Sequence, residues 1–263
     1  MRCQQLFHIL VSTTFLSKAA DEVKGVQLPW DGRFEKLGSL EDLQKAYLLH
    51  IFGDDCPNGK DCTLSKYVVL NSKERTNPFN KDTGTCSISI DNKAVFQSRE
   101  NMKRAELVQI FSVPPNSGVR LQFAFMITKA FINKELDYQV VFLESHKLEI
   151  RIQQTEVNKP EVRILYSSNP KDHIWGEELE YGKYYNFDVY CTAKYMRYVV
   201  SDDQGRLADK KQYDVQFDST DSKDREFHIG LLSYSTKAKH PDIVEGDTII
   251  FNGVSAEVLA PGV

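Results

Sequence analysis

The sequence predicts an all-β protein, a two-sheet sandwich of the β-jelly-roll type with one or two short helices. From Tyr67 onward, short strand-like runs alternate with turn residues such as the PPNSG at 114–118, a spacing typical of sandwiches and jelly rolls. The run Val140–Leu143 is apolar at every position. A strand of that kind is covered on both faces, so we expect it inside a stack of two sheets.

The first residues resemble a secretory signal peptide. Arg2 supplies a positive charge, an apolar run follows it, and Ser17–Ala19 offers small residues for cleavage within residues 1–20. The alternative is a buried N-terminal strand or helix. The favoured interpretation leaves residues 21–263 as a single β-jelly-roll domain of a secreted, extracellular protein.

The charge balance narrows the choice of partners. The chain of 263 residues has a formal net charge of −4 and a pI near 5.9. These values argue against a nucleic-acid or anionic-membrane partner. No later stretch is long and apolar enough to span a membrane. We also expect the protein to be a monomer.

Cysteine usage agrees with export. Without Cys3 the chain keeps Cys56, Cys62, Cys86 and Cys191, and four cysteines allow three disulfide connectivities. We favour a Cys56–Cys62 disulfide across a short turn. Cys86 and Cys191 lie in strand-like runs and could bridge neighbouring strands. No cysteine or histidine pair has zinc-finger spacing, so a zinc site is the weaker alternative. We assign no metal ligands and expect no cofactor.

The first elements of the mature chain are a strand and a helix. Val26–Phe34 is typical of a strand followed by a turn. Residues 39–50 are the best helix candidate, because apolar residues recur at helical spacing and Ser39 can cap the helix with Asp42 in the third position.

Two later polar stretches are most simply solvated loops. Residues 53–62 carry carboxylates, but they do not fit the EF-hand calcium pattern. Residues 218–226 have mixed charge and no apolar periodicity. We also expect a loop at 169–178.

Two strands carry a carboxylate with a basic partner two residues away. Because side chains alternate along a strand, Arg104 and Glu106 share one face, and Glu144 and His146 share another. If both faces line one groove, the two glutamates have the arrangement that a glycoside hydrolase needs. One protonated carboxyl serves the leaving oxygen, and one carboxylate activates water or attacks the anomeric carbon.

The neighbours of each glutamate suggest its role. Arg104 favours the ionised form of Glu106, and hence a base. Glu144 follows apolar residues, which favours the protonated acid. His146 and His228 could bind sugar hydroxyls or orient a carboxylate. The alternatives are a surface ion pair at Arg104–Glu106, solvent-facing side chains at 144 and 146, and a core histidine at 228.

Ordered blocks over nearly the whole mature chain resemble glycoside hydrolase family 131, secreted β-glucanases best known from fungi. The specific blocks are MKRAEL (102–107), YQVVFLESH (138–146) and FHIGLL (227–232). Supporting blocks are WDGRF (30–34), EDLQK (41–45), the run at 67–78, SISIDNKAVF (87–96) and DTIIFNGVSAEV (247–258).

The resemblance implies a β-jelly roll with an open cleft and hydrolysis of β-1,3, β-1,6 and β-1,4 linkages in β-glucan, with inversion. By position it implies catalytic roles for Glu106 and Glu144 and substrate contacts for Arg104 and His228. His146 matches its block.

The chain departs from the family pattern beside these blocks, at Tyr138, Leu143, Lys147 and Phe227. Loss of aromatic sugar platforms at these positions would favour a catalytically silent glucan-binding or host-interaction protein on the same scaffold. A polysaccharide lyase is a further alternative, but a lyase needs a cleft that neutralises uronates, which paired carboxylates fit poorly.

Overall fold

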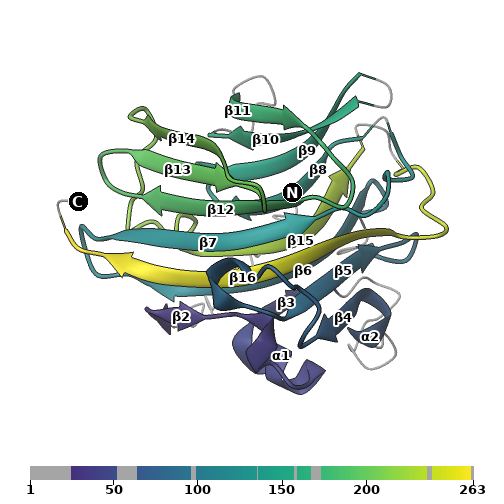
Figure 1. Ribbon diagram of the computed structural model, residues 1–263, viewed down its shortest axis with the longest axis horizontal. Coiled ribbons are helices and arrows are strands. Elements are labelled where there is room, and N and C mark those ends of the chain that lie inside the picture. Colours follow the sequence, from purple (N-terminus) through teal and green to yellow (C-terminus); the bar gives the residue numbers. More distant parts are fainter. Residues whose placement is uncertain are drawn as a thin grey trace, which may run out of the picture.

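The structure, a computed structural model, describes residues 25–51, 64–95, 99–134, 136–156, 159–166, 173–235 and 239–261. Two large, curved, mainly antiparallel sheets stack face to face, and the short helices lie at one edge (Figure 1). The predicted fold class is confirmed. The predicted signal peptide at 1–20 and the pair Cys56–Cys62 lie outside the described residues.

The first sheet carries the site. Its strands, in spatial order, are β1 (Val26–Gln27), β6 (Met102–Ser112), β15 (Glu226–Tyr234), β8 (Tyr138–Leu143), β9 (Glu149–Glu156), β10 (Lys159–Leu165) and β11 (His173–Glu178), with β3 (Leu48–His50) also paired to β6. The expected inner strand is therefore β8, and Val140–Leu143 is buried throughout. Residues 173–178, expected in a loop, form the edge strand β11.

The second sheet packs against the face of the first sheet that lies away from the site. Its order is β14 (Arg206–Gln212), β13 (Met196–Ser201), β12 (Tyr184–Cys191), β7 (Gly118–Met126), β16 (Asp247–Leu259), β5 (Thr85–Ile90) and β4 (Val68–Asn71), with β2 (Trp30–Asp31) paired to β16. Helix α2 (Leu64–Tyr67) and the 3-10 turns η1 (Phe34–Lys36) and η2 (Phe79–Lys81) complete the described elements.

Aromatic side chains fill the space between the sheets. The Phe227 ring lies 6.0 Å from both Phe111 and Phe123, and Phe123 stacks on Phe187 at 5.1 Å. Buried aromatic pairs at such separations add to the hydrophobic gain of burial. Phe227 thus belongs to the core.

Two of the other departures from the family pattern are also buried, and the third forms an ion pair. Tyr138 is buried and its hydroxyl donates to Asp247 at 2.8 Å, and Leu143 is buried. Lys147 forms an ion pair with Asp224 at 2.7 Å. The buried positions can present no aromatic platform to a sugar, but the Lys147 side chain is 35% exposed. The argument for a silent binder therefore loses its basis at the buried positions only.

Helix α1 (Leu40–Ala46) begins where the sequence predicts and ends earlier. The Ser39 side chain accepts a hydrogen bond from the Asp42 backbone N–H, which confirms the cap. Tyr47 is already extended, and its hydroxyl donates to the Gly32 carbonyl at 2.7 Å in the core. The predicted helix over residues 39–50 is thus wrong at its end, because Leu48–His50 pairs with β6 instead.

The proposed bridge between Cys86 and Cys191 is also wrong. Both are free, buried thiols. They lie on β5 and β12, which β7 and β16 separate within the sheet. Strands are about 4.8 Å apart, so three steps exceed the span of a disulfide.

Candidate active site

The Arg104–Glu106 pair lies on β6, as predicted, and is buried. Arg104 Nε donates to Glu106 Oε2 at 2.6 Å, and the Glu106 side chain is 1% exposed. The alternative of a surface ion pair is therefore excluded. Burying a carboxylate is costly unless it is paired, and the neighbouring strands supply further partners.

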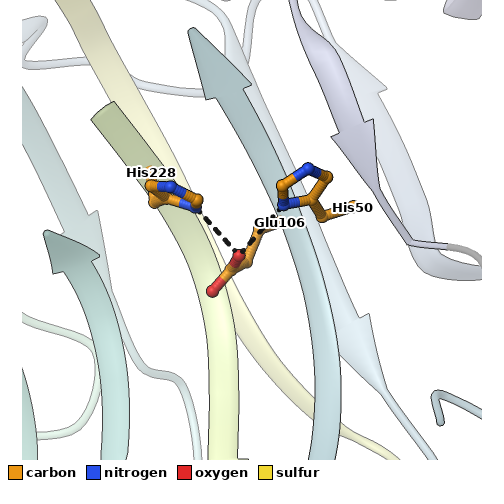
Figure 2. Close-up of side chains that lie close together, drawn as sticks. All are labelled: His50, Glu106 and His228. Carbon is orange, nitrogen blue, oxygen red and sulfur yellow. Dashed lines mark hydrogen bonds and ion pairs between the residues drawn. The ribbon is translucent and has the colours of Figure 1, made fainter. Parts of the chain in front are cut away.

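His228 on β15 is the second partner of Glu106. Its Nδ1 lies 3.1 Å from Glu106 Oε2, and its side chain is fully buried (Figure 2). The Phe142 ring of β8 stacks on the imidazole at 4.4 Å with an interplanar angle of 10°. The ring thus lies between residues of β6 and β8, and its orientation is fixed.

Sequence reasoning missed His50, the third residue around Glu106. His50 pairs with Glu106 across β3 and β6, and its Nδ1 lies 4.0 Å from Glu106 Oε2 (Figure 2). Arg104 Nη2 donates to the same nitrogen at 2.8 Å. The sequence placed His50 in the helix predicted over residues 39–50. The pairing of β3 with β6 instead brings it next to Glu106.

Glu144 lies in the turn after β8, so the expected strand does not continue to it. Its side chain is 41% exposed, and its Oε2 lies 3.6 Å from His228 Nε2. The structure therefore brings Glu144 and Glu106 to opposite nitrogens of one imidazole. Glu144 is the more exposed of the two carboxylates.

Glu226 is a third carboxylate of this cluster and was expected in a solvated loop. It is the first residue of β15, and its Oε1 lies 3.2 Å from His228 Nε2. The sequence did indicate this contact through the two-residue spacing of Glu226 and His228, which places both on one face if they lie in a strand. A strand start cannot be recognised from so polar a context.

His146 belongs to the tight turn that joins β8 to β9. Its φ of 57° lies in the left-handed region, and its backbone N–H donates to the Leu143 carbonyl at 2.7 Å. His146 Nδ1 lies 2.9 Å from Glu149, a fully buried carboxylate that also accepts from Arg151 Nε at 2.6 Å. His146 is therefore held by a second buried Glu–Arg pair, not by Glu144.

The charges of the cluster follow from these contacts. Burial alone would raise the pKa of Glu106, but the hydrogen bond from His228 and the charges of His228 and Arg104 lower it overall. Burial, together with Arg104, lowers the pKa of His50 to about 4. At neutral pH the cluster therefore holds an ionised Glu106 and a neutral His50.

An open groove runs over this face of the first sheet. It encloses about 870 Å³ and is lined by Arg104, Glu144, His146, Phe142, Gln139, Arg151, Gln153, Tyr234 and neighbouring residues. Glu106 and His228 lie beneath this lining. Three of the predicted site residues thus line the groove, and the other two are buried beneath it.

Two side-chain groups in the described part of the chain have metal-ligating atoms close together. One is His50, Glu106 and His228, and the other is Glu144, Glu226 and His228. In the first group the Arg104 guanidinium contacts all three residues. A cation would therefore meet a fixed positive charge at that position.

The model of the glycoside hydrolase 131 catalytic N-terminal domain matches residues 28–262. No curated protein shows significant similarity to the chain.

Two solved structures of that family resemble the fold. The GH131 β-glucanase catalytic domain from Podospora anserina is 22% identical, with 87% of this chain and 94% of that one covered and a TM-score of 0.67. The catalytic domain of the glycoside hydrolase family 131 protein from Coprinopsis cinerea is 19% identical, with coverage of 88% and 94% and a TM-score of 0.67. At these identities the likeness concerns the fold alone. The family match over most of the chain, together with a groove that holds paired glutamates, shows that this protein belongs to glycoside hydrolase family 131 and is a glycoside hydrolase.

Proposed function

We propose that the protein hydrolyses β-glucan, with β-1,3, β-1,6 and β-1,4 linkages as candidate bonds, and that Glu144 and Glu106 are its general acid and general base. The observation that carries this proposal is the different environment of the two carboxylates around one imidazole. Glu144 is exposed in the groove, whereas Arg104 and His228 hold Glu106 ionised. In glycosidases the base carboxylate is ionised while the acid carboxyl keeps its proton, and the ion-paired Glu106 fits the first of these roles.

Glu106 has one oxygen free for the base role. Arg104 and His228 both contact Oε2, while Oε1 is buried and has no hydrogen-bond partner within the described residues. A buried carboxylate oxygen without a partner needs an explanation. We assign Oε1 as the acceptor of a proton from the attacking water, with inversion at the anomeric carbon.

The groove fits a neutral glycan better than a polyuronate. Two of its arginines, Arg104 and Arg151, are each paired with a buried glutamate. The charges of these two are therefore compensated within the protein, whereas the third arginine of the lining, Arg99, is exposed. A lyase would use such charges to neutralise the uronate.

The test is reducing-sugar release from β-1,3-, β-1,6-, β-1,4- and mixed-linkage glucans by wild type, Glu106→Gln and Glu144→Gln. We expect release by wild type and a loss of at least about a hundredfold in each variant. Glu178→Gln, at an exposed end of the edge strand β11, serves as the matched control. Glucan binding without release by a folded wild type would support the silent glucan-binding alternative instead.

The stereochemistry needs its own measurement. The anomer released from a reducing-end-labelled oligosaccharide is followed by proton NMR before mutarotation. An initial α-anomer supports inversion, whereas an initial β-anomer would show retention and a nucleophilic carboxylate.

We further propose that the protein is secreted as a monomer after removal of residues 1–20, with residues 21–263 forming one domain. The signal-like pattern of the first residues supports the export step. None of the helices in the described ranges is long and apolar enough to cross a membrane. N-terminal sequencing and light scattering of protein collected from the culture medium test both points, and an intact Met1 would contradict the cleavage.

A further inference from the structure

Glu226 and Glu106 both contact the buried ring of His228. The two carboxylates approach from opposite sides, with Glu106 Oε2 at 3.1 Å from Nδ1 and Glu226 Oε1 at 3.2 Å from Nε2. Glu226 and His228 lie two residues apart on β15, so their side chains project from the same face of the strand. The arrangement therefore follows from the strand itself and needs no loop to hold it.

Both ring nitrogens thus face carboxylate oxygens. A neutral imidazole has one N–H and one lone pair, and a lone pair that faces a carboxylate is repelled. Only the imidazolium can donate from both nitrogens. The cluster accordingly selects the charged ring, although the ring is buried.

The other groups around the ring do not replace Glu226. Arg104 Nη2 lies 3.3 Å from Nδ1, and its positive charge opposes the imidazolium. The His50 ring lies at a centroid distance of 5.6 Å and is neutral above pH about 4. Phe142 covers one ring face and carries no charge. On the Nε2 side, the carboxyl groups among the described residues are Glu226 and the more distant Glu144, and Glu144 holds a proton in its acid role.

The charges around Glu106 also indicate that His228 depends on Glu226 to stay charged. Arg104 already neutralises Glu106 through a 2.6 Å contact. Without Glu226, a buried imidazolium would face a neutralised pair on one side and Glu144 at 3.6 Å on the other. Burial by itself lowers the pKa of His228, and the nearby Glu106 and Glu226 carboxylates reverse that shift to a net increase. The same contact with His228 lowers the pKa of Glu226.

We propose that Glu226 is a positioning residue that keeps His228 charged, with its Nε2–H directed between the Glu226 and Glu144 carboxylates. This inference rests on the proposed role of Glu144. When Glu144 gives its proton to the leaving oxygen, it becomes a carboxylate 3.6 Å from a charged donor. A charge-assisted contact of this kind stabilises that product form. Glu226 acts on the reaction through His228 and needs no contact with substrate.

The first experiment measures the ring and not turnover. The protein is labelled with 15N-histidine, and His228 is titrated by NMR from pH 4 to 10 in wild type, Glu226→Gln, Glu226→Asp and the control Glu178→Gln. We expect the His228 midpoint to fall by about one pH unit or more in Glu226→Gln, since one of its two anionic partners is lost. Glu226→Asp and Glu178→Gln should stay close to wild type. An unchanged midpoint in a folded Glu226→Gln variant overturns the inference.

The second experiment follows kcat/KM against pH for the same proteins. The alkaline limb should move to lower pH in Glu226→Gln by the same amount as the NMR midpoint, and Glu226→Asp should restore it. A uniform loss of rate without a shifted limb would show a merely structural role and contradict the inference. If wild type releases no sugar but the NMR midpoint still shifts, the contact of Glu226 with His228 stands and the proposed function fails.

Discussion

Gly230 on β15 lies directly opposite Glu106 on β6, and the two strands meet there without any side chain on the glycine. A Cβ at Gly230 would lie 2.3 Å from the Ala105 carbonyl oxygen and 2.7 Å from Glu106 Cα. Both are backbone atoms of β6 that cannot move aside alone. The glycine thus makes room for the buried carboxylate.

Gly230→Ala should therefore destabilise the fold by about 3 kcal/mol, the upper range for overpacking a core, and should lower activity by displacing Glu106. Urea unfolding monitored by tryptophan fluorescence measures the loss. Gly38→Ala is the matched control, since its Cβ would meet only Asp42 Oδ2, at 3.7 Å. Equal stability of the two variants would contradict the packing argument.

Glu149→Gln should cost about 3–5 kcal/mol of unfolding free energy, the usual cost of breaking a buried ion pair. Glu149 is fully buried and bridges His146 and Arg151, and the other acidic contact of Arg151, with Asp137, is 3.6 Å long. Chemical denaturation gives the value, with Glu178→Gln as the exposed control. A change below about 0.5 kcal/mol, as at ordinary surface sites, would show that the Arg151 charge does not depend on Glu149.

Tyr234→Ala should weaken glucan binding and leave the chemistry intact. Tyr234 lines the groove with half of its side chain exposed, two β15 residues from Leu232, and its ring offers an apolar face for a sugar. We expect KM to rise about tenfold, or about 1.4 kcal/mol, with kcat changed little. Tyr213→Ala, an exposed tyrosine outside the groove lining, should behave as wild type. A fall in kcat at constant KM would refute a binding role.

His50 should make the protein less stable in acid. Its folded-state pKa is lowered to about 4 from a usual value of 6.5, so between these pH values the unfolded chain binds more protons than the folded one. Stability from this group is complete above pH about 6.5 and is lost as pH falls toward 4.

The contribution of His50 is about 1–3 kcal/mol. The measurement is the difference in unfolding free energy between pH 7 and pH 4.5 for wild type and His50→Gln. The variant should show the smaller difference, whereas the exposed-site control His173→Gln should match wild type. Identical differences in wild type and His50→Gln would exclude this role of His50.

Cys86 and Cys191 should not react with Ellman's reagent in the native protein. Both are buried free thiols, and burial raises the pKa of Cys191 to about 12 and that of Cys86 further. Since the thiolate is the reactive form, labelling should appear only in denaturant. Peptide mapping after labelling identifies the sites, and a linked Cys86–Cys191 peptide would contradict the sheet order. The same map tests the expected Cys56–Cys62 pair.

Local rules determined much of this protein from its sequence. The unbroken apolar run Val140–Leu143 identified an inner strand, because a strand covered on both faces has no polar side. The Ser39 cap identified the start of α1, because the side chain that accepts a free N–H of the first turn is a neighbour in the chain. Arg104 and Glu106 were paired correctly, since their two-residue spacing defines a shared strand face.

Tertiary structure decided which of these local features meet. His50 and Glu226 join the cluster because β3 and β15 both pair with β6. The sequence of one strand does not indicate which distant strand it will pair with. Cys86 and Cys191 stay apart because two strands lie between them. Side-chain alternation and caps extend over a few residues, whereas the order of strands in a sheet depends on how the whole chain buries its apolar faces.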